Sequence, residues 1–332
     1  MIKKSILLVF TVLFSVMYVY AQKAPTSFNS YDGMAVSARS IAMGGTGVAM
    51  TGSIDNIFYN SAGLAFIQGN EIQVEALFSA SRQSNISNDT LNAIEPINLG
   101  FNSFVVLQEQ GAISWRTLSS NVKFSSGTDY WSRQNENIKA ITISASQKSQ
   151  NNDYAVGIGL SYLYGTLAES SVISGNPFAQ TSSGNGFAID IGFVAPVNKN
   201  ITFGINLENV LGFMWWNDYD CEQLPFGVRT GLGYQVGGFT MLADFNKKFY
   251  RFTDSNDTIY SIGLEQNITR VLAVRLGTQS TSIADFTNEN EVKYTYGFVL
   301  NISTFSFSFA NETYKFNNEN ISKYIISLKT VI

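Results

Sequence analysis

The chain has 332 residues, of which 14% are charged and 14% aromatic, and a formal net charge of −4. This balance offers no basic field for nucleic acid, and a soluble surface would carry more charge, about 25–35%. With no histidine and only one cysteine, Cys221, the sequence lacks His-based triads, an internal disulfide and the usual zinc and redox motifs. We therefore expect no enzyme activity, no cofactor and no metal site.

Residues 1–21 predict a secretory signal peptide. Lys3 and Lys4 precede an apolar run, and the small Ala21 follows it, which is the pattern of a cleaved leader rather than of a membrane span. No later apolar run approaches the roughly 18 residues of a membrane helix. An exported chain of this kind is either soluble or crosses a membrane as a closed β-barrel, because the backbone must be satisfied in lipid.

A stretch of small residues, 35–65, follows the leader and carries only two charges, Arg39 and Asp55. It begins with a helix-compatible run that is broken by Gly44, Gly45 and Gly47. Glycine favours turns and close backbone approach. The pattern allows two interpretations: an N-terminal arm packed on a β domain, or a plug folded into the lumen of a barrel.

From Glu71 onward, fourteen segments alternate apolar and polar residues with period 2, the signature of β-strands. In one of them Val292 and Tyr294 alternate with Lys293 and Thr295. The predicted strands span 71–82, 97–108, 112–124, 137–148, 154–165, 184–196, 200–210, 224–236, 239–249, 258–268, 271–282, 290–302, 305–315 and 321–332. A soluble β-sandwich shows the same alternation, so periodicity alone leaves the fold open.

The lengths of the connections favour a membrane barrel. Every second connection is a tight turn, such as Glu109-Gln110-Gly111 or Gly237-Gly238. The other predicted connections are longer and span 83–96, 125–136, 166–183, 211–223, 250–257, 283–289 and 316–320. Short periplasmic turns alternating with long outer loops are typical of outer-membrane barrels, and a Greek-key sandwich has no reason to alternate in this way.

One face of the predicted strands carries charges of both signs. They are Glu75, Arg116, Asp190, Glu208, Arg229, Asp244, Glu265, Arg275, Lys293 and Lys329. A charge that faces lipid at mid-depth costs about 2–4 kcal/mol, so we predict that this face lines the lumen. Two roles remain open for these residues: ion pairs that brace the barrel and the plug, or a path for a substrate.

Four bulky apolar residues stand together in the predicted connection 211–223, which we place at the outer mouth. They are Phe213, Met214, Trp215 and Trp216. Tryptophan concentrates at membrane interfaces, so one interpretation is an aromatic girdle. The other is a landing site for a hydrophobic solute, since aromatic rings and the adaptable methionine offer large contact areas.

The small-residue stretch also carries a recognisable motif set. It contains Ala38-Arg39, Ala42-Met43-Gly44-Gly45, Gly47-Val48-Ala49, Asp55 and Asn60-Ser61-Ala62-Gly63-Leu64. Through these residues it resembles the N-terminal hatch of the FadL/TodX superfamily of outer-membrane barrels, which includes the PorV-like proteins of type IX secretion. Where the family usually has Asn-Pro-Ala-Gly, this chain has Ser61 in place of the proline.

Together these features predict an all-β protein, a 14-stranded antiparallel transmembrane β-barrel of the outer membrane with a small N-terminal helical hatch in its lumen. We expect a signal peptide at 1–21, a hatch at 22–70 and a barrel at 71–332, with both termini in the periplasm. The resemblance implies these hatch residues: Arg39, Gly44, Gly45, Gly47, Asp55, Asn60 and Gly63.

The resemblance implies passive uptake of small hydrophobic compounds. Its alternative is a PorV-like role, in which the barrel is a docking platform for type IX protein secretion. The expected partners are outer-membrane lipid, a hydrophobic solute or secretion-system proteins, and the barrel assembly machinery. The barrel assembly machinery recognises a signal in the C-terminal strand of its substrates. One face of the final strand here resembles that signal and carries Tyr324, Ile326, Leu328, Thr330 and Ile332.

Overall fold

The structure is a computed structural model, and it describes residues 37–69, 72–83, 100–127, 130–151, 153–173, 176–250, 256–283, 290–316 and 319–332. The predicted signal peptide lies outside these residues. Within the described ranges, no helix is both long enough and apolar enough to cross a membrane.

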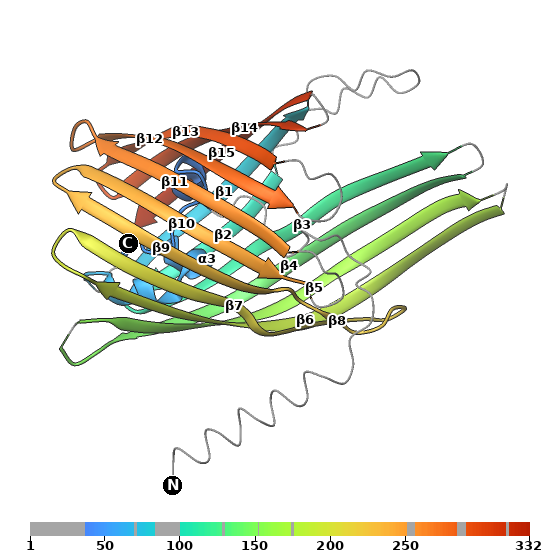
Figure 1. Cartoon of the computed structure of the whole chain (residues 1–332), viewed down its shortest axis with the longest axis horizontal. Helices are drawn as coiled ribbons and strands as arrows, with labels where there is room; N and C mark the ends of the chain where they lie inside the picture. Colours follow the sequence, from blue (N-terminus) through green and yellow to red (C-terminus); the bar gives the residue numbers. More distant parts are fainter. Residues whose placement is uncertain are drawn as a thin grey trace, which may run out of the picture.

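The strands form one closed antiparallel barrel (Figure 1). They are β1 (Ile72–Gln83), β2 (Gly100–Gln108), β3 (Gly111–Gly127), β4 (Tyr130–Lys148), β5 (Ala155–Ile173), β6 (Asn176–Pro196), β7 (Ile201–Trp216), β8 (Glu222–Gln223), β9 (Phe226–Val236), β10 (Phe239–Phe249), β11 (Asn256–Asn267), β12 (Leu272–Ile283), β13 (Asn290–Ile302), β14 (Phe305–Phe316) and β15 (Glu319–Val331). The first strand pairs with the last, and β6 pairs with β7 to complete the ring. The two-residue β8 only lengthens the pairing beside β7, so the prediction of fourteen barrel strands is confirmed.

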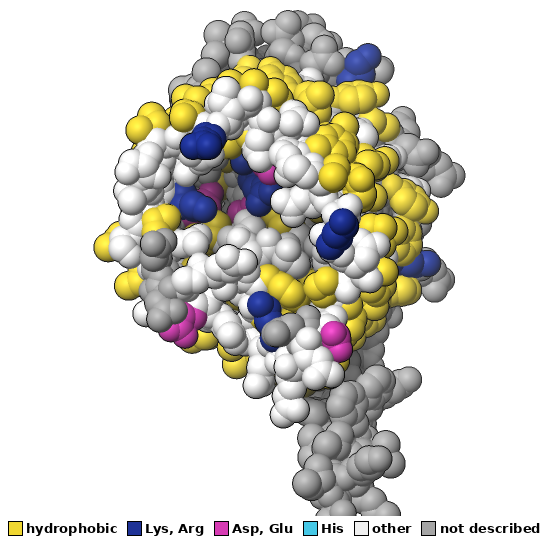
Figure 2. All heavy atoms as spheres, turned by 90° about the vertical axis from the view of Figure 1, so that its left-hand side faces the viewer, with side chains coloured by type: hydrophobic (Ala, Val, Ile, Leu, Met, Phe, Trp, Pro, Cys, Tyr) yellow, Lys and Arg dark blue, Asp and Glu magenta, His cyan; other side chains and the backbone are white. Residues whose placement is uncertain are grey.

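The outer wall is apolar and the inner wall is small and polar, as the alternation predicts. Tyr294 is 66% exposed on the outer face of β13, whereas its neighbour Thr295 is 4% exposed and faces the lumen. The apolar outer face suits contact with lipid. Because the sheet is closed, it has no open edge that would leave unpaired backbone N–H and C=O groups in lipid. Figure 2 shows the end view, with hydrophobic side chains over the outside of the wall.

Four neighbouring strands, β3 to β6, run well past the rest of the barrel (Figure 1). They have 17, 19, 19 and 21 residues, while about 9–11 tilted residues suffice to cross a membrane. The predicted long loops 125–136, 166–183 and 211–223 are therefore wrong, because these ranges are mostly strand. The ranges 125–136 and 166–183 are mostly polar, so they show little apolar alternation although they pair as a sheet. In 211–223, the apolar residues continue β7 to Trp216.

The opposite end of the barrel carries the tight turns. Glu109 and Ser303 adopt positive φ of 52° and 56° in two of them, and Gly237 has φ 56° in a third, which suits two-residue hairpins. Ile72 and Ile332 exchange backbone hydrogen bonds of 3.3 and 2.9 Å. The first and last barrel strands therefore begin and end at this turn-bearing end.

The N-terminal segment folds inside the barrel near the same end (Figure 1). It contains two short helices, α2 (Ala38–Ala42) and α3 (Asn56–Tyr59), and the 3-10 helix η1 (Ser61–Phe66). The side chain of Ser37 caps α2 by accepting from the backbone N–H of Arg39 and Ser40. The helical hatch in the lumen is thus confirmed, and the alternative of an arm packed elsewhere on a β domain is wrong.

Candidate functional site

The inside of the barrel has three levels: the hatch near the turn-bearing end, a ring of charged side chains above it, and an apolar cluster where β3 to β6 leave the barrel. Figure 2 looks onto the turn-bearing end and shows a hollow inside the wall in which side chains of both charge signs are visible.

Arg39 ties the hatch to the wall. Its Nη2 lies 2.8 Å from Oε1 of Glu265 and its Nε donates to Oε2 at 3.0 Å. Arg275 of β12 donates to the same carboxylate at 2.6 Å. Burial by itself lowers the pKa of Arg39, but the carboxylates of Glu265 and Asp55 outweigh it and the pKa is raised. One wall carboxylate thus holds a hatch cation and a wall cation together.

Other wall side chains satisfy the backbone of the hatch. Asp244 accepts from the N–H groups of Gly47 and Val48 at 2.7 and 3.0 Å. Thr295 accepts from the Gly44 N–H at 2.9 Å and donates to the Ala42 carbonyl at 3.1 Å. These bonds account for backbone groups that the short, broken helices leave unpaired.

Asn60 performs a similar task from the hatch side. Its Nδ2 lies 2.8 Å from the carbonyl oxygen of Val48 within the hatch, and 3.0 and 3.2 Å from those of Phe193 and Ile205 in the wall. Its Oδ1 accepts from the Ala62 N–H at 3.2 Å and so caps η1. The serine that replaces the family's proline, Ser61, is buried in this turn.

Glycines on the inner wall let the hatch backbone approach closely. We call these the seat glycines: Gly157, Gly192, Gly204, Gly263 and Gly277. A β-carbon at any of them would overlap hatch atoms, for example the Gly44 nitrogen in the case of Gly277. The seat extends over strands β5, β6, β7, β11 and β12, so the hatch is fitted to this part of the wall backbone to backbone.

Within the hatch, the predicted glycines have specific roles. Gly44 and Gly45 have φ of 71° and 77°, the left-handed region that ends α2 and favours glycine. A β-carbon at Gly47 would overlap Tyr59, and one at Gly63 would overlap Asn56. Asp55 is 2% exposed and lies 3.5 Å from the Ser40 hydroxyl. All seven predicted hatch residues therefore lie within the folded plug.

The charged ring lies on the side of the hatch that faces the long strands. Arg229 pairs with Glu208 at 2.7 Å and lies 5.6 Å from the Tyr59 ring. Arg116 lies 5.3 Å from the Phe58 ring, and Asp190 accepts from the Asn209 N–H at 2.7 Å. Two hatch aromatics are thus covered by wall guanidinium groups, which are attracted to the faces of aromatic rings.

The remaining predicted lumen charges also face inward. Lys293 pairs with Glu312 at 3.8 Å and lies 4.9 Å from the Tyr314 ring, away from the hatch. Glu75 is 9% exposed on β1 beside the hatch, and it is directly paired in register with Lys329 of β15. The observed contacts are ion pairs, cation–π contacts and bonds to the hatch, as expected for residues that brace a plug.

Beyond the charged ring, the inner face becomes apolar. We call this group the mouth cluster: Leu118, Ile138, Ala140, Leu163, Leu167, Ala188, Met214, Trp216 and Leu224. All of its members are at most 5% exposed. Leu118 reaches it through a bulge, since the β3–β4 register shifts between Thr117 and Ser119. The tip between β7 and β8 leans on the cluster through Tyr219, whose hydroxyl donates to Glu169 at 2.9 Å.

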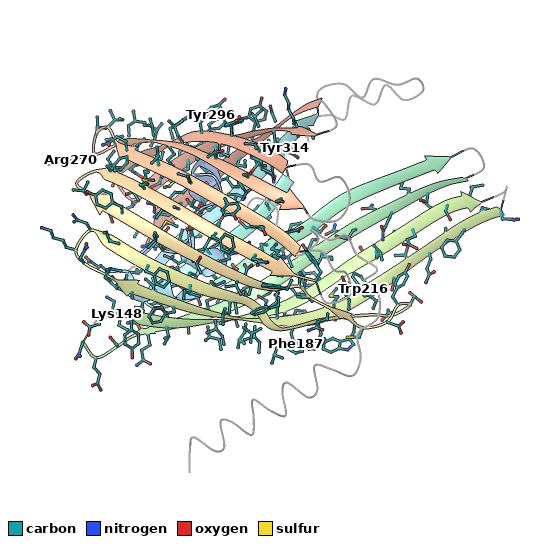
Figure 3. All side chains as sticks on the ribbon, in the orientation of Figure 1. Lys148, Phe187, Trp216, Arg270, Tyr296 and Tyr314 are labelled. Atoms are coloured by element: carbon teal, nitrogen blue, oxygen red, sulfur yellow. The ribbon has the colours of Figure 1, made fainter. Side chains whose placement is uncertain are left out.

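The predicted loop of four apolar residues is a strand end, and this corrects its placement. Because β7 continues to Trp216, successive side chains alternate across the wall. Met214 and Trp216 face inward in the mouth cluster, and the Trp216 indole donates to Glu222 at 3.0 Å. Phe213 and Trp215 face outward, where their rings lie 6.0 and 5.7 Å from the Phe187 ring. Figure 3 shows Phe187 on the outside of the wall.

Sequence reasoning missed two features of this site. The inward positions of the seat glycines were visible in the alternation, but their partners are hatch atoms more than 90 residues away in several cases, such as Gly157 and Ala62. The mouth cluster draws single residues from separate strands, which no local pattern reveals. Among the described residues, no group of three metal-ligating side chains is present.

A closed antiparallel barrel with an apolar outside, a polar lumen and a helical plug defines the class: a plugged barrel of the outer-membrane type. No protein-family model and no curated protein sequence matches the chain. Several solved structures match the chain. The toluene transporter TbuX of Ralstonia pickettii is 14% identical, with a TM-score of 0.64 over 92% of this chain and 99% of that chain.

Two further structures agree. The monoaromatic hydrocarbon channel CymD is 11% identical with a TM-score of 0.63, over 89% of this chain and 97% of that one. A FadL homologue of Pseudomonas aeruginosa is 10% identical with a TM-score of 0.58, over 94% and 99% of the two chains. The chain therefore has the fold of the FadL-like outer-membrane channels, as the hatch motifs predicted.

Proposed function

We propose that the protein takes up small hydrophobic compounds across the outer membrane by passive transport. The observation that carries this proposal is the mouth cluster. The interior of a barrel that conducts water-soluble molecules is polar, whereas the inner wall here carries nine apolar residues, packed against one another, on the outer side of the plug. The chains of like fold that are named as toluene transporters or as monoaromatic hydrocarbon channels support the same class of solute.

The proposed orientation places the turn-bearing end and both termini in the periplasm and the long strands outside, as in outer-membrane barrels generally. A solute then meets the mouth cluster first, the charged ring next and the hatch last. It passes as the hatch shifts locally, without energy coupling. We also propose that the barrel assembly machinery inserts this protein. The outward-facing residues of β15 support this, since Tyr324 and Leu328 are exposed on the outer wall.

Matched pairs on β7 test the proposal. Met214→Ala with Trp216→Ala removes inward contacts, and Phe213→Ala with Trp215→Ala removes outward ones of the same kind. Loss of buried apolar contacts of about 1–3 kcal/mol slows toluene uptake by about tenfold or more in the inward pair only. Leu163→Ala is a second inward variant that preserves the Trp216–Glu222 bond. Uptake is measured in cells after heat-modifiable gel migration has shown a folded barrel.

Equal uptake in both β7 pairs would overturn the import function. A second function, docking of secreted proteins as in PorV-like barrels, is favoured by one observation, the sheet that β3 to β6 extend beyond the barrel (Figure 1). For that function, the inward pair leaves uptake of toluene unchanged, and truncation of the extended sheet stops secreted proteins from reaching the cell surface.

A further inference from the structure

The outer wall of β4, β5 and β6 changes character at a definite level. Nearer the turn-bearing end it exposes Ile143, Ile158 and Leu160. Next comes a belt of hydrogen-bonded aromatics, in which the Trp115 indole donates to the Tyr164 hydroxyl at 2.8 Å and the Tyr162 hydroxyl donates to Asn185 at 2.7 Å. Aromatic belts of this kind lie at the membrane–water interface, so residues beyond it lie at the depth of lipid headgroups.

Beyond the belt, the outward face is polar and positively charged. By strand alternation and register, the positions between the belt and the apolar pair Val172 and Pro177 near the strand tips are Arg133, Asn135, Asn137 and Lys139 on β4, Thr166, Ala168 and Ser170 on β5, and Ala179, Thr181 and Ser183 on β6. None of these ten positions carries a carboxylate. Among the described residues of β4 and β5 in this region, Glu136 is 2% exposed, and the carboxylate of Glu169 accepts from Tyr219 on the inner side.

This face is hollowed. A depression of about 380 Å³ is lined by Arg133, Asn135, Ala168, Glu169, Ser170, Ala179, Gln180 and Thr181. By strand alternation, its outward-facing lining residues are the two alanines, one guanidinium, one amide and two hydroxyls, and Glu169 and Gln180 belong to the inward-facing rows. Guanidinium groups bind phosphate in a planar fork, and amides and hydroxyls both donate and accept, which is the chemistry that recognises phosphorylated sugars.

A second cation lies between this depression and the membrane. The Nζ of Lys139 is 5.7 Å from the Trp115 ring, at the level of the aromatic belt. Arg133 and Lys139 share one face of β4 and stand about 20 Å apart at the rise of an extended strand. A ligand that reaches both must carry more than one anionic group and must lie against the wall at the edge of the bilayer.

We propose that this face, from Lys139 to the depression at Arg133, binds the phosphorylated saccharide headgroup of a glycolipid in the outer leaflet. The face is continuous with the aromatic belt, so a lipid headgroup reaches it with its acyl chains against the apolar wall. Its charge is complementary to phosphate. The proposal rests on the outward orientation of the long strands given above and is independent of solute uptake.

Binding of lipid A to the purified full-length chain in detergent tests the proposal. Native mass spectrometry compares phosphorylated lipid A, dephosphorylated lipid A, phosphatidylglycerol and inorganic phosphate. The wild type binds phosphorylated lipid A most tightly, and Arg133→Gln with Lys139→Gln weakens this binding by about tenfold or more, because charge-assisted bonds are lost. Lys199→Gln with Arg270→Gln is the matched control at the turn-bearing end (Arg270 is labelled in Figure 3) and leaves the affinity within about twofold.

Several results would overturn the site. Unchanged affinity in the Arg133–Lys139 variant, or equal loss in the control, would show that the face does not bind lipid A. Equal binding of dephosphorylated lipid A or of phosphatidylglycerol would remove the phosphorylated saccharide as the ligand. Maleimide labelling of Asn135→Cys on intact cells, in a Cys221→Ser background, tests the orientation separately. Absence of labelling there would place this face in the periplasm and exclude an outer-leaflet ligand.

Discussion

Ile143 and Asn137 stand on the outward face of the same strand, β4, on either side of the aromatic belt that contains Trp115 and Tyr164. Ile143 is 55% exposed to the surroundings of the wall, and Asn137 is also exposed. Both belong to the same antiparallel ladders with β3 and β5, and they differ in the medium that they face. Lipid penalises a charge strongly at mid-depth and weakly near the interface.

Arginine at these two positions measures that difference. Ile143→Arg destabilises the folded barrel by about 2–4 kcal/mol, whereas Asn137→Arg costs about 0–1 kcal/mol. Urea unfolding in phospholipid vesicles, followed by heat-modifiable gel migration, gives both values. Equal stability of the two variants would contradict the position of the membrane boundary on β4.

The surroundings of a residue also decide the effect of the buried charges inside the lumen. Glu265 holds Arg39 and Arg275 within 2.8 and 2.6 Å, and an ion pair in such a place adds little net stability because both partners lose hydration. Loss of one partner is costly, since it leaves an unpaired buried charge. These residues therefore fix the position of the hatch more than they strengthen the barrel.

At the scale of elements, the hatch and the wall fit through backbone contact rather than through large side chains. Small hatch residues such as Ala62 and Gly44 face the seat glycines Gly157 and Gly277. This arrangement leaves no room for even one methyl group. Protein interiors packed at this density respond to such a change with strain or displacement.

Two glycines on the same face of β5 provide the test. Gly157→Ala places a β-carbon against Ala62 and Ser61, while a β-carbon at Gly159 meets nothing nearer than the Ser144 hydroxyl at 3.4 Å. Overpacking costs about 1–3 kcal/mol, so Gly157→Ala loosens the hatch and Gly159→Ala does not. Limited proteolysis of the folded proteins detects the loosening as faster cleavage within residues 37–69. Identical cleavage rates would show that the seat does not hold the hatch.

The extended parts of β3 to β6 are strands that the sequence pattern does not reveal. Once past the membrane, β3 to β6 need no apolar face, and backbone pairing alone continues the sheet. This is why the polar ranges 125–136 and 166–183 look like loops in the sequence. An irregular loop and a solvent-exposed β-sheet can have the same amino-acid composition. They differ in whether their backbones pair with segments far away in the chain.

At the scale of the whole molecule, the hatch is what closes the lumen. Fourteen strands enclose more space than wall side chains alone can fill, and the hatch contacts wall residues from Leu77 of β1 to Ile325 of β15. In the described part of the chain, no other segment enters this space.

Deletion of residues 37–69 therefore converts the protein into an open pore. Sensitivity of cells to small polar antibiotics rises, and purified protein in planar bilayers conducts ions in steps that the wild type lacks, because water fills the vacated lumen. Heat-modifiable migration must first show that the shortened chain still forms a barrel. A folded barrel with unchanged conductance would mean that the hatch is not the plug.

The sequence by itself determined the barrel. Period-2 alternation places Val292, Tyr294 and Tyr296 on one face whatever the tertiary structure, and the tight turns fix antiparallel pairing between neighbours, so strand number and lumen charges follow from local rules. Only the tertiary structure decided where β3 to β6 end, that Met214 and Trp216 face inward while Phe213 and Trp215 face lipid, and which glycines seat the hatch. Those features depend on contacts between segments far apart in the chain, and a local pattern records the face of a residue but not the partner it meets there.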